Sequence, residues 1–272
     1  MSDSLSGKTA VVTGSSTGIG EGIAKAYAEA GANVVTNSRS QERAESTAAE
    51  IEAAGGSAIG VEADVTDRAD IQTVVDTAID EFGRLDVMVN NAGIPAVEPA
   101  MEIDPEDWRQ VIDVNLTGVF FGCQAAGTRL IEQGEGGQII NISSIFGSVG
   151  VHGRSPYNAS KGGVNNLTRS LAVELAEYDI HVNAIAPGYI KTPLTDVTSN
   201  SDGDERRDEQ TWPYYGFDDQ HIRNRTPLGR WGTLEEIGNW AVFLAEGDHF
   251  ATGEIVHADG GWLAFGWGSK GR

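Results

Sequence analysis

The sequence predicts an α/β protein built on one doubly wound parallel sheet of about seven strands, with helices on both faces. Short apolar runs of strand length alternate with stretches of helix length along the chain. Strands that are joined by helical crossovers form parallel sheets, because the helices cover the two faces. No low-complexity linker and no internal repeat interrupts the 272 residues, so a single domain over 1–272 is expected.

The seven strands are expected where β-branched and other apolar residues follow one another. They cover residues 9–13, 33–37, 57–62, 87–90, 137–142, 181–185 and 254–257. Good helix formers between them predict helices over 20–30, 41–54, 68–82, 105–132, 155–177 and 234–244. In such a sheet a ligand binds at the carboxyl ends of the strands. Six strand ends carry polar or turn residues there, namely Gly14, Ser38, Asp64, Asn91, Ser144 and Pro187.

The turn after the first strand reads Thr13-Gly-Ser-Ser-Thr-Gly-Ile-Gly20 and leads into a helix. Glycines let the backbone approach a phosphate closely, and the free N–H groups of a helix start stabilise its negative charge. A tight strand-to-helix connection without a ligand is the alternative. The position of the turn at the first strand favours the phosphates of a dinucleotide.

Tyr157 and Lys161 are four residues apart in a predicted helix and therefore lie on one face of it. A free tyrosine has a pKa of about 10, and a nearby ammonium group lowers it, which makes the phenol a usable acid or base. Ser144 ends a predicted strand, where its hydroxyl can bind a carbonyl or alcohol oxygen of a substrate. These three residues are the candidate catalytic residues.

Taken together, these motifs resemble the classical short-chain dehydrogenase/reductase family over nearly the whole chain. Thr13-Gly-x-x-x-Gly-Ile-Gly20 matches its cofactor turn, and Asn90-Asn-Ala-Gly93 matches the segment after its fourth strand. Asn115, in Asp113-Val-Asn-Leu-Thr-Gly118, matches the asparagine of a helix, and Pro187-Gly188 with Thr192 matches the segment beside the nicotinamide. Ser144, Tyr157 and Lys161 match the catalytic residues.

The resemblance implies a Rossmann fold and a role for each matched residue. Tyr157 is expected to act as general acid in reduction and as base in oxidation. Lys161 is expected to lower the pKa of Tyr157 and to hold the nicotinamide ribose. Ser144 is expected to polarise the substrate oxygen, and Asn115 to hold a water that links Lys161 to solvent. The remaining implied cofactor contacts are Gly14, Ser16, Thr17, Gly18, Ile19, Gly20, Ser38, Arg39, Asp64, Val65, Asn91, Ala92, Gly93, Pro187, Gly188, Ile190 and Thr192.

The end of the second strand bears on the choice of cofactor. NAD-binding proteins of this kind place a carboxylate there to bind the adenosine ribose. Here the position holds Ser38, followed by Arg39, whose guanidinium can bind a 2′-phosphate with two hydrogen bonds. NADP(H) is therefore expected as the preferred cofactor, with NAD(H) possible if Arg39 instead stacks on the adenine. Asp64 is expected at the adenine; the alternative is that it caps a helix, with Thr66 or Asp67 as competing caps.

Composition excludes several classes of function. With 40 acidic and 19 basic residues the formal charge is −21, which disfavours nucleic acid as a partner. No apolar run is long enough to span a membrane, and 1–8 lacks the apolar core of a signal peptide. Cys123 is the single cysteine, so no internal disulfide can form and a cytoplasmic location is expected. The scattered histidines give no metal motif. Lysine contributes only five of the basic residues, a pattern that favours a halophilic protein over an ordinary acidic enzyme.

Two segments depart from the alternating pattern. Residues 193–230 combine an acidic cluster with Trp212, Tyr214 and Tyr215, and this long connection predicts a substrate lid. A surface insertion adapted to salt is the alternative. Residues 260–272 are rich in glycine and tryptophan, and they are expected to pack against a neighbouring subunit or over a site. The resemblance implies a homotetramer.

These observations predict an oxidoreductase that interconverts a secondary alcohol and a ketone with NADP(H). Aromatic and polar side chains, with His152 and Tyr189 added to those of the lid, favour a sugar or polyol, as in a glucose dehydrogenase. The alternative is a 3-oxoacyl-[acyl-carrier-protein] reductase, for which Arg154, Arg223, Arg225 and Arg230 would form a basic entrance. A non-catalytic nucleotide-binding regulator is a remote alternative, because Tyr157 and Lys161 are both present.

Overall fold

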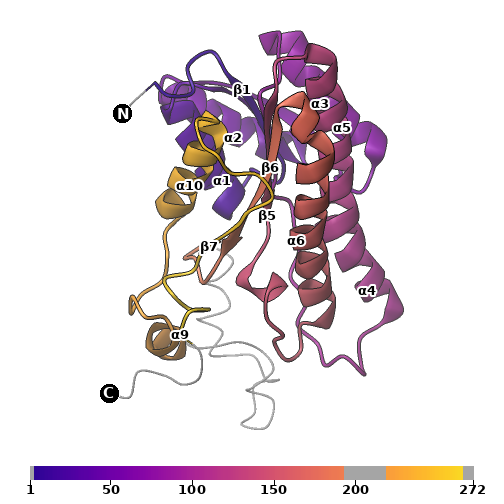
Figure 1. Cartoon of the computed structure of the whole chain (residues 1–272), viewed down its shortest axis with the longest axis vertical. Coiled ribbons are helices and arrows are strands. Elements are labelled where there is room, and N and C mark those ends of the chain that lie inside the picture. The colour runs from indigo at the N-terminus through magenta and orange to yellow at the C-terminus, as the bar shows by residue number, and fades with distance from the viewer. Residues whose placement is uncertain (1–2, 193–218, 266–272) are drawn as a thin grey trace.

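A single sheet of seven parallel strands forms the centre of the computed structural model, which describes residues 3–192 and 219–265. The strand order is β3-β2-β1-β4-β5-β6-β7, and Figure 1 shows the sheet between two groups of helices. The strands are β1 (Thr9–Val12), β2 (Asn33–Ser38), β3 (Ser57–Glu62), β4 (Val87–Asn90), β5 (Gly137–Ile142), β6 (Ile180–Pro187) and β7 (Ile255–Ala258). Every residue of the central strands β1 and β4 is buried, as expected for a parallel sheet covered on both faces. The predicted fold class is confirmed.

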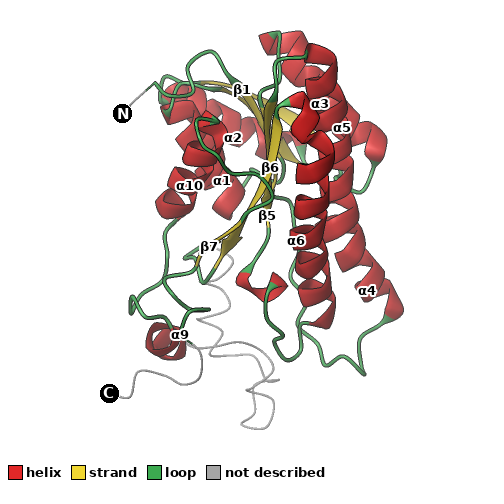
Figure 2. Cartoon of the chain, viewed as in Figure 1, coloured by secondary structure: helices red, strands yellow, loops and turns green. Residues whose placement is uncertain are grey.

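Helices cover both faces of the sheet (Figure 2). One face carries α1 (Gly18–Glu29), α2 (Gln41–Ala53) and α10 (Leu234–Glu246), and Ile23, Tyr27 and Leu244 belong to its core. The other face carries α3 (Arg68–Phe82), α4 (Pro105–Ile112), α5 (Gly118–Gln133) and α6 (Ser155–Leu175), with a separate core. The short helix α9 (Asp219–Arg225) lies beyond the carboxyl ends of the strands (Figure 1).

The helix predicted over 105–132 is not continuous. A π-helical turn, Asp113–Thr117, separates α4 from α5. The extra residue of such a turn is costly in an α-helix, and π-turns are frequent at functional sites. Asn115 lies in this turn and is fully buried. Apolar residues recur at helical spacing throughout the segment, so no change of spacing in the sequence indicated the π-turn.

Two further boundaries differ from the sequence prediction. The helix predicted to end at 177 ends at Leu175, and a 3-10 turn, Ala176–Tyr178, follows. Helix α9 occupies part of the segment predicted as a lid, and residues 193–218, including Trp212, Tyr214 and Tyr215, lie outside the described residues. The lid therefore stays a prediction.

Candidate active site

Hydrogen bonds join the glycine turn, which follows β1, to the end of the neighbouring strand β4. The strand order reverses between these two strands. Asn91 donates from its side-chain amide to the carbonyls of Thr13 (2.9 Å) and Gly14 (3.0 Å). The Thr13 hydroxyl in turn accepts from the backbone N–H of Asn91 (3.0 Å) and Ala92 (3.2 Å). A Cβ at position 20 would lie 2.3 Å from the Asn91 amide nitrogen, so only glycine fits there. This junction is the topological switch point, at which ligands of doubly wound sheets bind.

The start of α1 is suited to a phosphate. Gly14 and Gly18 both have φ of +61°, a conformation that glycine adopts without strain. Thr17, the residue before the helix, makes no side-chain hydrogen bond to the first amides. The N–H groups of this helix start therefore point outward without a side-chain cap, beside half-buried Ser16 and Ile19. The residues present fit a dinucleotide pyrophosphate.

Asn37 and Ser15 support this turn, and the sequence analysis did not identify either residue. Asn37 accepts from the N–H of Gly14 (3.1 Å) and donates to the carbonyls of Val61 and Ala63 (3.2 Å each). Ser15 accepts from the N–H of Asn37 (2.8 Å). Both side chains are buried. Asn37 is a polar residue at an inward position of a strand predicted to be buried. This was the signal that could have identified it.

At the end of β2, Ser38 is buried and Arg39 is exposed. Arg39 lies near Asp64, whose carboxyl pKa is lowered first by the Thr66 N–H, then by the Thr66 hydroxyl and by Arg39. The Asp64 side chain accepts from both Thr66 groups, whereas Asp67 caps α3 by accepting from Ala69. Of the competing caps, Asp67 is the one observed.

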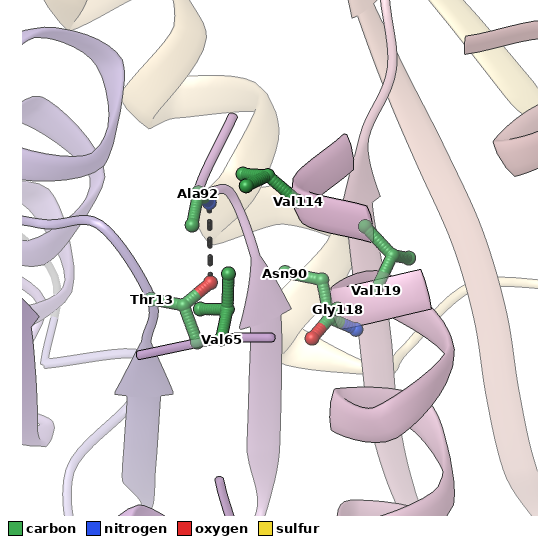
Figure 3. Close-up of a pocket in the computed structure, with 7 residues that line it drawn as sticks. All are labelled: Thr13, Val65, Asn90, Ala92, Val114, Gly118 and Val119. Atoms are coloured by element: carbon green, nitrogen blue, oxygen red, sulfur yellow. Dashed lines mark hydrogen bonds between the residues drawn. The ribbon is translucent and has the colours of Figure 1, made fainter. Parts of the chain in front are cut away.

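A small pocket opens beside this edge (Figure 3). Its walls combine two of the predicted cofactor residues with apolar groups and the Thr13 hydroxyl. The lining residues are Thr13, Val65, Asn90, Ala92, Val114, Gly118 and Val119. Figure 3 shows the hydrogen bond from the Ala92 N–H to the Thr13 hydroxyl at one wall of the pocket.

Ser144 and Tyr157 meet at the carboxyl end of β5. Ser144 precedes a short 3-10 turn, Ile145–Gly147, and accepts from the Phe146 N–H (3.2 Å). Tyr157 lies in the first turn of α6, close to Ser144. Burial raises the pKa of Tyr157, while the Ser144 hydroxyl and the nearby Arg154 guanidinium lower it. The structure therefore brings the Ser144 and Tyr157 side chains together.

Lys161 lies one turn after Tyr157 on α6 and is buried. Its ammonium group donates to the carbonyl of Ile142 (2.8 Å) and lies 5.8 Å from the centre of the Tyr157 ring. Burial lowers the pKa of Lys161 to about 8. We expected Lys161 to lower the pKa of Tyr157. In this structure Ser144 and Arg154 lower the pKa of Tyr157, and the contribution expected of Lys161 stays a prediction.

Asn115 connects the π-turn to the segment after β4. Its side chain accepts from the Ile94 N–H (2.8 Å) and donates to the Ile94 carbonyl (2.9 Å) and to Ser160 (3.3 Å). A Cβ on Gly93 would lie 3.2 Å from the Asn115 oxygen and 3.6 Å from the Lys161 nitrogen. The predicted residues Gly93, Asn115 and Lys161 are therefore neighbours.

The segment after β6 forms the last part of the candidate site at the carboxyl edge of the sheet. Pro187 ends the strand, and a Cβ on Gly188 would lie 2.8 Å from the Asp259 Cα, so this position requires glycine. Ile190 is buried in the core against α1 and α10. A Cβ on Gly18 would lie 3.8 Å from the Thr192 side chain, which places Thr192 at the glycine turn.

An aromatic cluster adjoins Tyr157. The Phe146 ring contacts those of Tyr157 (6.4 Å between centroids), Tyr189 (6.1 Å) and Trp262 (6.2 Å), and the Tyr189 ring contacts that of Trp231 (5.7 Å). Phe146 and Trp231 were not identified from the sequence, since no motif includes them. Trp262, from the predicted tail, packs over the site within its own chain. Residues 266–272 lie outside the described part, and the role of 260–272 in a homotetramer stays a prediction.

The four arginines of the predicted basic entrance differ in their partners. Arg223 pairs with Asp219 (2.5 Å), and Arg230 binds Glu236 with two hydrogen bonds (2.6 and 2.9 Å). Arg154 and Arg225 instead lie against the aromatic cluster. The charges of Arg223 and Arg230 are therefore neutralised locally, which weakens the case for a basic docking surface.

Other features play no direct part at this edge. Cys123 is buried, which raises the pKa of its thiol to about 12, and its sulfur accepts from the Asn90 amide (3.3 Å) and donates to Asn141 (3.4 Å). Within 3–192 and 219–265, no three histidine, cysteine or carboxylate side chains converge in a way that could hold a metal ion. Among the helices described, none has the length and apolar character that a membrane span requires.

Comparison with known proteins agrees with this geometry. A family model described as short chain dehydrogenase matches residues 8–203. A glucose 1-dehydrogenase of Bacillus subtilis is 39% identical over 96% of each chain, and a 3-oxoacyl-[acyl-carrier-protein] reductase of Synechocystis is 39% identical over 81% of this chain and 82% of that one. A gluconate 5-dehydrogenase of Burkholderia cenocepacia, solved with NADP and tartrate, superimposes with a TM-score of 0.84 at 35% identity over 96% of each chain.

The family match spans well over half of the chain, and relatives of this identity act on CH–OH groups. The parallel sheet with helices on both faces is the fold that the resemblance implied. The chain therefore belongs to the short-chain dehydrogenase family, whose members are NAD(P)-dependent oxidoreductases.

Proposed function

We propose that this protein interconverts a secondary alcohol and a ketone with NADP(H) as the preferred cofactor. One observation carries the proposal. The Tyr157 hydroxyl, which can exchange a proton with a substrate oxygen, lies close enough to Ser144 for that hydroxyl to lower its pKa, and it lies beside buried Lys161. All three lie at the carboxyl edge of the sheet, next to a helix start that fits a pyrophosphate.

The side chains divide the chemistry as follows. Ser144 binds the substrate oxygen and orients it toward Tyr157. In oxidation Tyr157 accepts the hydroxyl proton, and in reduction it donates that proton to the carbonyl oxygen. The positive charge of Lys161 favours the phenolate, and Asn115 fixes the backbone at Ile94, next to Gly93 and the lysine. A bound nicotinamide supplies or accepts the hydride.

The same edge supplies the cofactor contacts. Gly14, Ser16, Thr17, Gly18, Ile19 and Gly20 would hold the pyrophosphate, and Asp64, Val65 and Ala92 would contact the adenine beside the pocket of Figure 3. Lys161 would hold the nicotinamide ribose, and Pro187, Gly188, Ile190 and Thr192 would flank the ring.

Arg39 supports the preference for NADP. It is exposed at the end of β2, where the adenosine ribose of this fold lies, and the preceding Ser38 offers no carboxylate to a 2′-hydroxyl. The residue in register with Ser38 on β3 is Glu62, and its carboxylate already accepts from the Gln41 N–H (3.0 Å). The Burkholderia neighbour binds NADP, which agrees with this assignment.

A sugar or polyol is the substrate class that we favour. Aromatic rings stack on the faces of sugars, and Phe146, Tyr189 and Trp262 present such a wall beside Tyr157. The glucose and gluconate dehydrogenases among the relatives act on substrates of this kind. A 3-oxoacyl-carrier reductase is the second candidate, favoured by the Synechocystis relative.

A substrate panel tests the proposal. The protein would be assayed with sugars, polyols and 3-oxoacyl thioesters, each with NADP(H) and NAD(H). We expect turnover of a hydroxylated substrate with NADP, and a loss of about tenfold in kcat/KM for NADP, but not for NAD, in Arg39→Gln. Turnover of thioesters alone would favour the second candidate, and NADP binding without any turnover would argue for a regulatory protein.

We also propose that the protein works at high salt, which the charge of −21 and the scarcity of lysine support. Salt screens repulsion between surface carboxylates and so stabilises such a chain. The melting temperature should rise between low and molar KCl. An unchanged melting temperature and activity would contradict a halophilic adaptation.

A further inference from the structure

The stretch 142–144, at the carboxyl end of β5, is joined to three successive turns of α6. Its first residue accepts from the Lys161 ammonium group (2.8 Å), and its second donates to the side-chain oxygen of Asn165 (2.6 Å). Its third residue, Ser144, lies close to Tyr157. Because Tyr157, Lys161 and Asn165 are four residues apart, they lie one turn after another on one face of the helix. The strand end and the helix are therefore fixed relative to each other at the candidate site.

The contact between Ser143 and Asn165 is the member of this series that the proposed mechanism does not use. Both side chains are buried, with exposed fractions of 3% and 4%. The Ser143 hydroxyl also lies 3.3 Å from the Lys161 carbonyl oxygen, and the Ser143 N–H donates to the Ile185 carbonyl of β6 (2.7 Å). A buried polar group that loses its partner is costly, so such contacts resist displacement. Ser143 is thus held by both the helix and the neighbouring strand.

Asn165 contacts the chain on both sides of Ser144. Before Ser144, its side-chain oxygen accepts from Ser143. After Ser144, the 3-10 turn packs against the same amide: a Cβ on Gly147 would lie 2.8 Å from the Asn165 nitrogen, so this close approach requires glycine. Within that turn the Phe146 N–H donates to the Ser144 hydroxyl (3.2 Å). Asn165 therefore holds the chain both before and after the Ser144 hydroxyl.

We propose that Asn165 is a positioning residue, which sets the place of the Ser144 hydroxyl relative to Tyr157. It does so by holding Ser143 and the turn that follows Ser144. The inference rests on the proposed function and adds a residue to it. Asn165 lies one turn beyond Lys161, on the side away from Tyr157, so it acts through Ser144 and not on the substrate itself. Such an effect can be large, because a misplacement of about 1 Å can cost about 100-fold in rate.

Kinetics and a spectroscopic titration together test this role. Asn165→Leu and Ser143→Ala each remove the hydrogen bond from one side. We expect each to lower kcat for oxidation by about tenfold and to leave the NADP dissociation constant within about twofold of wild type. A displaced Ser144 no longer lowers the pKa of Tyr157, so the phenolate should form at higher pH. Phenolate absorbance, measured as the difference from the same variant carrying Tyr157→Phe, reports this shift without turnover.

The double variant, Ser143→Ala with Asn165→Leu, shows whether the two residues act through one contact. It should be no slower than the slower single variant, because both changes remove the same hydrogen bond. Ser143→Ala removes a single atom, so it keeps the test decisive if Asn165→Leu does not fold.

Thr168→Val is the matched control. Thr168 is also buried on α6, and it accepts from a β5 side chain, that of Asn141 (3.0 Å), three residues before Ser144. The change should lower the melting temperature but keep the kcat and the phenolate titration of wild type.

The positioning role would be overturned by any of three results. The first is a loss of kcat in Thr168→Val equal to that in Asn165→Leu. The second is an unchanged kcat or an unchanged phenolate titration in Asn165→Leu and Ser143→Ala, and the third is an additive loss in the double variant. Absence of turnover in wild type would instead contradict the proposed function, and the phenolate titration would still decide the role of Asn165.

Discussion

The two halves of the candidate site are constructed differently. On the cofactor side, side chains such as Asn37 and Asn91 hydrogen-bond to the backbone of the glycine turn, and a methyl group at Gly20 has no room. On the substrate side, rings and cations meet that come from the 3-10 turn Ile145–Gly147, the start of α6, the segment after β6, α9 and the C-terminal segment. The cofactor side therefore depends on backbone geometry, and the substrate side on side-chain identity.

This difference explains why relatives of similar identity act on glucose and on acyl carriers. A site built from backbone atoms tolerates few changes and keeps one ligand. A wall built from side chains changes its specificity whenever one ring or cation is replaced, while the fold beneath it stays the same.

Ser144→Ala should give the largest effect among the supporting residues. It removes the hydrogen bond that lowers the pKa of Tyr157, and with it a ligand of the substrate oxygen. We expect kcat/KM for oxidation to fall by about 100-fold at neutral pH. Because the phenolate is the base, activity rises with pH through the Tyr157 pKa, and this rise should move to higher pH in the variant. If the rise in activity stays at the same pH in the variant as in wild type, Ser144 does not lower the pKa of Tyr157.

Gly20→Ala tests the rigidity of the cofactor side. The added methyl would lie 2.3 Å from the Asn91 nitrogen and 2.5 Å from the Gly14 carbonyl oxygen. We expect a loss of about 2 kcal/mol in the free energy of unfolding and a matching loss of NADP affinity. In the control, Gly162→Ala, the methyl meets only the Gly147 carbonyl at 3.5 Å, and the helix should gain up to about 1 kcal/mol. If Gly20→Ala and Gly162→Ala changed the free energy of unfolding equally, the cofactor side would not depend on backbone geometry.

The pH dependence of stability gives a smaller effect, which comes from Lys161. Its folded pKa of about 8 lies below the 10.5 of a free lysine, so the unfolded chain binds more protons between these values. Stability must therefore rise with pH across this window, since the cost of burying a charged Lys161 is present below pH 8 and is relieved above it. Between about pH 7.5 and 9.5, wild type should gain about 2 kcal/mol relative to Lys161→Met in urea titrations. Parallel curves for the two proteins would mean that Lys161 titrates normally.

The sequence predicted the fold class, and it named candidate residues for the cofactor side because their signals are local. The glycine turn and the Asn-Asn-Ala-Gly segment each fall within a few residues, and so does the Tyr–Lys spacing of the candidate catalytic residues. Asn37 was missed because its partners come from two other strands, and the π-turn at Asn115 was missed because it does not alter the apolar period.

The substrate side could not be predicted in the same way. Phe146, Arg154, Arg225 and Trp262 are brought together only by the fold, over more than a hundred residues. The four arginines were equivalent in the sequence, and only the structure shows that Arg223 and Arg230 bind the carboxylates of Asp219 and Glu236.

The most direct test of the central claim compares binding and turnover in Tyr157→Phe. The change removes only the hydroxyl that Ser144 contacts, so the cofactor side should be untouched. We predict an NADP dissociation constant within about twofold of wild type and a kcat/KM lower by roughly 1000-fold on the best substrate of the panel. A variant that keeps its activity would contradict the assignment of Tyr157 as the proton donor and acceptor, and with it the proposed mechanism.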